Sequence, residues 1–112
     1  AALAAGRGEV DRAHGLVELA LGRSRDAGDW QSEVSHLRTL GDVAAQAGRI
    51  ADARGSYEAA LAQARRCGSP AQEAATACVL AVLDRRCGRL AEAEDGFLAA
   101  RALQAAANRA TP

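Results

Sequence analysis

The sequence predicts an all-α protein in which antiparallel helix hairpins are stacked side by side. Gly8, Gly48 and Gly88 stand 40 residues apart, with helical spacing of apolar residues and short gaps between them. Each glycine is followed at fixed offsets by an alanine, a bulky apolar residue and a second alanine: Ala13, Val17 and Ala20; Ala53, Tyr57 and Ala60; Ala93, Phe97 and Ala100. Tandem copies of one helical unit indicate a stack rather than a closed globule.

The first two helices are expected over about 9–27 and 30–47, and an apolar stripe marks the second. The stripe consists of Leu37, Leu40, Ala44 and Ala47. This spacing places the four side chains on one face of a helix. We expect Asp29 to cap the start of the second helix and Gly48 to end it as a glycine in the left-handed region.

The third and fourth helices are expected over about 50–67 and 70–87. Asp52 falls in the first turn of the third helix, where a carboxylate meets the positive end of the helix dipole. The apolar stripe of this helix consists of Ile50, Ala53, Tyr57, Ala60, Leu61 and Ala64. Gly68 is expected to end it, and the segment 69–72 (Ser-Pro-Ala-Gln) predicts a capping box with proline in the first helical position.

The fifth helix is expected over about 90–107, with fraying from Ala105 to Pro112. Leu3 aligns with apolar positions of the later copies, so the residues before Gly8 are expected to be the end of a further helix. Because the gaps are two or three residues long, neighbouring helices must run antiparallel. We expect one repeat array over 1–112, with a partial repeat over 1–28, full repeats over 29–68 and 69–108, and a tail over 109–112.

Composition and charge exclude several classes of protein. The 112 residues carry 14 basic and 14 acidic side chains, whereas non-specific nucleic-acid binding needs an excess of cations. We therefore expect no nucleic-acid partner. No apolar run approaches the length of a membrane span, so we expect no membrane partner and a cytoplasmic location. Because the first residue is not Met, we also expect the chain to be a segment of a longer protein.

The residues that most often carry chemistry form no recognisable site. Cys67, Cys78 and Cys87 lack the spacing of a disulfide framework or a zinc site, and we expect them to be small buried hydrophobic residues in a reduced cytosol. His14 and His36 have no partner at ligand spacing and are expected at the surface or its boundary. No motif pairs a nucleophile with a base. We therefore expect no enzyme activity, no cofactor and no metal.

The repeated residues resemble the tetratricopeptide repeat, a helix pair with small residues at fixed crossing points. The first full copy reads Leu37-x2-Leu40-Gly41-x2-Ala44, then Gly48, Ala53, Tyr57 and Ala60; the second reads Ala77-x2-Leu80-Ala81-x2-Asp84, then Gly88, Ala93, Phe97 and Ala100. This resemblance implies an α-solenoid with a right-handed superhelical stack of hairpins. The period of 40 exceeds the usual length of about 34 residues, and this longer variety resembles arrays in large bacterial regulators and scaffolds.

Two other helical repeats are alternatives. HEAT and armadillo repeats have periods of about 40–47 residues, but they do not normally carry the glycine, alanine and aromatic pattern found here. A pentatricopeptide RNA reader is a weaker alternative, because it is expected to have a shorter period and a surplus of basic residues.

The resemblance implies that the first helix of each pair lines a concave groove that holds a ligand. The partner-binding residues carried over position by position are Ser35, Arg38, Thr39, Asp42 and Gln46 in the first copy, and Val79, Val82, Arg85 and Arg86 in the second, where Ala75 and Cys78 accompany them. Arginines around an apolar floor suit a helix or an extended peptide with acidic groups. Alternatively, Arg38 and Asp42 form only a solvated pair one turn apart, and the other arginines are merely exposed.

These features predict a protein–protein interaction module that holds a peptide, a helix or a neighbouring domain, within a larger bacterial regulatory or scaffold protein. One alternative is a self-association or spacer module. A stable array generally needs at least about three repeats, and this segment has two full repeats and a partial one. Another is an inducer-sensing repeat domain of a transcriptional regulator. Trp30, the only tryptophan, either packs on the preceding helix, which we favour, or anchors a partner.

Overall fold

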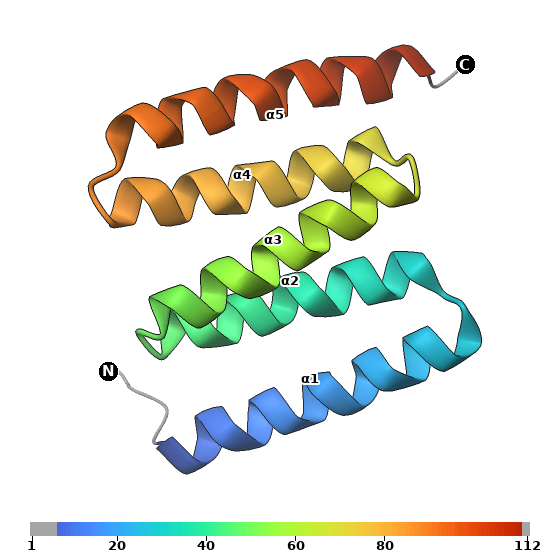
Figure 1. Cartoon of the computed structure of the whole chain (residues 1–112), viewed down its shortest axis with the longest axis vertical. Helices are drawn as coiled ribbons and strands as arrows, with labels where there is room; N and C mark the ends of the chain where they lie inside the picture. The colour runs from blue at the N-terminus through green and yellow to red at the C-terminus, as the bar shows by residue number, and fades with distance from the viewer. Residues whose placement is uncertain (1–6, 111–112) are drawn as a thin grey trace.

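Five helices follow one another in a stack in the computed structural model, which describes residues 7–110 (Figure 1). They are α1 (Arg7–Ala27), α2 (Trp30–Gln46), α3 (Ile50–Arg66), α4 (Pro70–Arg86) and α5 (Leu90–Ala110). Each helix packs against the next one along the chain, and α2 also touches α4. The prediction of an all-α stack of antiparallel helix hairpins is therefore confirmed for the described residues.

The turns between the helices are built alike. Gly28, Gly48, Gly68 and Gly88 all have positive φ angles, between 65° and 79°. In the turn between α2 and α3, the Arg49 N–H donates to the carbonyl of Ala44 and the Gly48 N–H donates to that of Ala45. This pattern satisfies the last carbonyls of the helix and reverses the chain within two or three residues. The predicted helix ends at Gly48 and Gly68 are confirmed.

The predicted caps lie at the starts of α2 and α4. The Asp29 carboxylate accepts the Ser32 N–H at 3.2 Å, and the Ser69 hydroxyl accepts the Gln72 N–H at 3.3 Å. The capping box is only half formed, because the Ser69 N–H already donates to the Ala64 carbonyl in the preceding turn. The Gln72 side chain instead accepts a hydrogen bond from α2.

The terminal helices are longer than predicted. α1 begins at Arg7, and α5 continues to Ala110 although we expected an end near 107 and fraying from Ala105. Alanine has the highest helix propensity, and no glycine or proline follows Gly96 until Pro112. The helix therefore has no reason to stop early. The further helix expected around Leu3 lies outside the described residues.

Two apolar clusters join the first four helices of the stack. The first joins α1, α2 and α3 through Leu21, Val34, Leu37, Leu40, Ala60 and Ala64. The second joins α2, α3 and α4 through Ala44, Ala45, Ala53, Tyr57 and Leu83. The repeated alanines at 53 and 60 are fully buried, as expected where small side chains let two helix backbones approach. Trp30 packs against the first cluster, which confirms the packing role that we favoured.

The prediction that the cysteines are buried is wrong. Cys78 and Cys87 are exposed, and Cys67 is only partly buried. Cys67 and Cys87 stand directly beyond the last turns of α3 and α4. Within the described residues, no three His, Cys, Asp or Glu side chains are grouped to hold a metal ion. In the same part of the chain, no helix is both long and apolar enough to cross a membrane.

Candidate functional site

A hollow of about 260 Å³ lies where α2, α3 and α4 meet, and we call it the α2–α4 groove. Its apolar lining consists of Ala45, Val79, Val82 and Leu83, and its polar lining consists of Asp42, Gln46, Tyr57 and Arg86. Five of the nine predicted partner-binding residues therefore lie together: Asp42, Gln46, Val79, Val82 and Arg86.

Helical periodicity explains why these residues meet. Asp42, Ala45 and Gln46 are three and four residues apart and share one face of α2. On α4, Val79, Val82, Leu83 and Arg86 follow the same spacing. Because α2 touches α4, these two faces adjoin, while α3 contributes Tyr57 to the groove.

A short hydrogen bond fixes one side of the groove. The Tyr57 hydroxyl donates to Oδ1 of Asp42 at 2.5 Å. Tyr57 is only 4% exposed. Burial, and then the hydrogen bond and negative charge of Asp42, raise the pKa of Tyr57 well above its usual value, although Arg86 opposes the shift. Tyr57 therefore keeps its proton at neutral pH and holds the Asp42 carboxylate in place.

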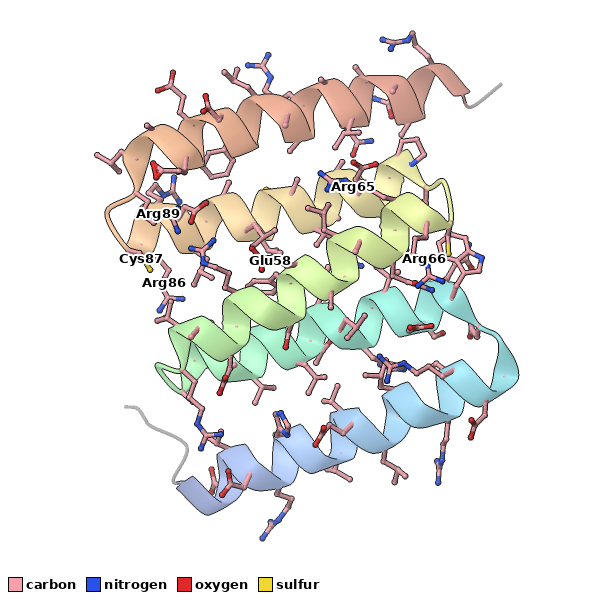
Figure 2. All side chains as sticks on the ribbon, viewed as in Figure 1. Glu58, Arg65, Arg66, Arg86, Cys87 and Arg89 are labelled. Carbon is pink, nitrogen blue, oxygen red and sulfur yellow. The ribbon has the colours of Figure 1, made fainter. Side chains whose placement is uncertain are left out.

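Arg86 of α4 adds a positive charge to the groove. Figure 2 shows it at the C-terminal end of α4, near the turn between α2 and α3. The side chain is exposed, and it takes part in none of the ion pairs found within residues 7–110. The groove thus offers, on α2, a carboxylate engaged by a tyrosine and, on α4, an arginine that can meet an acidic ligand group.

The structure places the remaining predicted residues outside the α2–α4 groove. Arg38 donates to the Gln72 side chain at 2.9 Å and so ties α2 to α4. The Thr39 hydroxyl donates to the carbonyl of Ser35 at 3.0 Å, on the exposed side of α2. Arg85 lies 5.5 Å from the centre of the Phe97 ring. It therefore faces α5, because neighbouring residues on a helix point in different directions.

The suggested pairing of Arg38 with Asp42 does not form. Each side chain has a partner on another helix, Gln72 for Arg38 and Tyr57 for Asp42. Sequence reasoning assigned Tyr57 only to the core and missed its contact with the groove. One signal was available: Tyr57 carries a hydroxyl where the next copy has Phe97, and a buried hydroxyl usually finds a hydrogen-bond partner.

Comparisons with protein-family models, with curated proteins and with solved structures find no match for this chain. Its own geometry defines a stack of helix hairpins with an open groove between α2 and α4. The groove combines an apolar lining with a negative charge on α2 and a positive charge on α4.

Proposed function

We propose that this chain is a protein–protein interaction module of the tetratricopeptide type, within a larger bacterial regulatory or scaffold protein. The turns, caps and buried alanines that recur every 40 residues support this assignment. In such a module the hairpins form a right-handed superhelix, and α2 and α4 line its concave side. The observation that carries the proposal is the α2–α4 groove, whose lining comes mainly from these two helices.

The ligand that best fits the groove is a peptide or helix with an apolar side chain followed by an acidic one. The apolar side chain would sit on Val79, Val82 and Leu83, and the acid would reach Arg86. Asp42 on α2 should repel an acid, so the two charges favour a ligand whose acidic group lies toward α4.

The proposal can be tested with a phage-displayed peptide library selected on the whole chain. We expect selected peptides to share an apolar residue near an acidic one. Val79→Glu and Val82→Glu should each weaken binding of a selected peptide at least about tenfold, because they place a carboxylate on the apolar floor. Circular dichroism should show unchanged helicity. Binding that survives both substitutions would remove the α2–α4 groove from the proposal.

A charge reversal tests the role of Arg86 separately. Arg86→Glu should weaken the binding of an acidic peptide. It should not weaken the binding of the same peptide with an amide in place of the acid. Arg66→Glu is the matched control, because Arg66 is an exposed arginine near the turn between α3 and α4, at the other end of these helices (Figure 2). Equal losses in the two variants would show a general charge effect instead of recognition by Arg86.

A further inference from the structure

A second apolar surface lies on the outer side of α5 and the adjoining part of α4, and we call it the α5 face. Two hollows of about 320 and 390 Å³ adjoin there and share Phe97 and Arg101. Leu90 and Leu98 on this face are 65% and 55% exposed. None of the residues that line these two hollows lines the α2–α4 groove. The α5 face is thus a separate surface.

The equivalent surface of the preceding repeat is covered by a helix. Forty residues earlier, α3 carries Ile50 and Tyr57 at the positions of Leu90 and Phe97. α4 covers that part of α3, since Leu83 lies in one apolar cluster with Tyr57 and Ile50 packs against it. The cover is fixed by an ion pair between Arg54 of α3 and Asp84 of α4. The part of the α5 face around Leu90 and Phe97 is therefore equivalent to a surface that holds a helix.

The charges on the α5 face differ from those on α3. Glu94 stands where α3 has Arg54. A covering helix with the sequence of α4 would bring Asp84 against Glu94, and two like charges in contact repel. A helix that brings a cation to Glu94 would fit this face better.

α5 itself carries that cation in the right place. Glu94 and Arg101 lie three residues before Phe97 and three residues after Leu98. Neither takes part in an ion pair found within residues 7–110. If two copies of α5 pack antiparallel about a twofold axis at Phe97 and Leu98, each Glu94 meets the Arg101 of the other copy. The face is therefore complementary to itself.

We propose that the α5 face binds the α5 face of a second copy of this chain, forming a twofold dimer. Phe97 and Leu98 form the apolar centre, and the two pairs of Glu94 with Arg101 flank it. Leu98 replaces Glu58 of α3, so α5 exposes a large apolar residue where the equivalent helix has a charge. Exposed apolar residues inside a polar rim are typical of an interface between proteins.

Sedimentation of the whole chain over a range of concentrations tests the dimer. Leu98→Glu should raise its dissociation constant at least about tenfold, because each dimer loses two apolar contacts at its centre. The variant should fold, since the equivalent position of α3 already holds Glu58. Leu16→Glu is the control: Leu16 is 62% exposed on α1 at the other end of the stack, and its replacement should leave the dimer unchanged.

A charge swap tests the antiparallel register. Glu94→Arg alone and Arg101→Glu alone should each weaken the dimer, whereas an equal mixture of the two variants should form a heterodimer. The double variant should again pair with itself. A wild-type chain that stays monomeric at high concentration would overturn the proposal. Loss of the dimer in Leu16→Glu, or no rescue in the mixture, would overturn it too.

Discussion

The two full repeats have the same order of helices and turns, but the surroundings of their aromatic residue differ. Both have an Arg–Glu bridge across the turn that precedes the first helix, Arg25 with Glu33 at 3.3 Å and Arg65 with Glu73 at 2.9 Å. In the first repeat Tyr57 is buried and bonded to Asp42. In the second repeat Phe97 is only partly buried, and Val82 stands at the position of Asp42.

The difference follows from what lies next to each repeat. α4 packs on α3 and closes the first repeat, so a buried hydroxyl there needs an internal partner. Within residues 7–110, no further helix packs on α5 in this way. Phe97 has no polar group to satisfy, and Arg85 lies over its ring. The two full repeats therefore both place an aromatic ring at this position, and only the buried one carries a hydroxyl that needs a partner.

The largest expected effect tests this comparison directly. Tyr57→Ala should lower the free energy of unfolding by about 3–5 kcal/mol, the usual cost of emptying a buried aromatic site. Phe97→Ala should cost clearly less, because less of the ring is buried. Urea unfolding of both variants in the Leu98→Glu background, where Phe97 is in no dimer interface, measures the difference. Equal costs would show that the two repeats bury their aromatic residues to the same extent.

Most of the fold follows from local sequence signals. A glycine in the left-handed region, a capping side chain and helical spacing act within a few residues, which explains why the helices and turns around Gly48 and Ser69 were predicted. The end of α5 was missed because nothing local stops it. Fifteen residues separate Asp42 from Tyr57, and their contact depends on how two helices cross, which spacing alone does not fix.

The groove was predictable only in part for the same reason. The positions of Asp42, Gln46, Val79, Val82 and Arg86 follow from the helix face that each repeat presents. The directions of Arg38 and Arg85 depend on partners in other helices, Gln72 and Phe97. The exposure of the cysteines likewise depends on which helix covers them. These facts require the packed structure.

An effect of intermediate size concerns pH. In the unfolded chain Tyr57 should ionise near its ordinary pKa of about 10, whereas burial raises its pKa in the folded protein. Folding therefore favours the protonated form of Tyr57. The stabilisation that this group gives the folded state is complete below about pH 10 and is lost as the pH rises above that value, by up to about 1.4 kcal/mol per pH unit.

Urea unfolding at several alkaline pH values measures this loss. Because Tyr57 is the only tyrosine, the ultraviolet absorbance of its phenolate follows the same group in the folded protein. Tyr57→Phe should lower the free energy of unfolding by about 1 kcal/mol at neutral pH, the value of one hydrogen bond. Above about pH 10 the variant should not show the loss of stability that ionisation of Tyr57 causes in the wild type. A wild-type phenolate signal that appears near pH 10 without unfolding would contradict a buried, protonated Tyr57.

The smallest expected effect compares two glycines of the first repeat. Gly55 lies within α3 with open space beside it, so Gly55→Ala should stabilise the protein by about 0.5–1 kcal/mol through helix propensity. Gly41→Ala should gain the same helix propensity, but a Cβ at position 41 would overlap the Tyr57 ring. Overpacking of a core costs about 1–3 kcal/mol, so Gly41→Ala should be neutral or destabilising.

A double-mutant cycle separates these two contributions at Gly41. In the Tyr57→Leu background the ring is absent, and Gly41→Ala should then stabilise the protein about as much as Gly55→Ala does. The second repeat has Ala81 at the position of Gly41 and places its glycine on the opposite helix, at Gly96, where a Cβ would come within 3.0 Å of the Cβ of Ala81. If Gly41→Ala stabilises the wild-type chain as well, the Tyr57 ring can move, and the packing of Tyr57 against α2 does not require glycine at position 41.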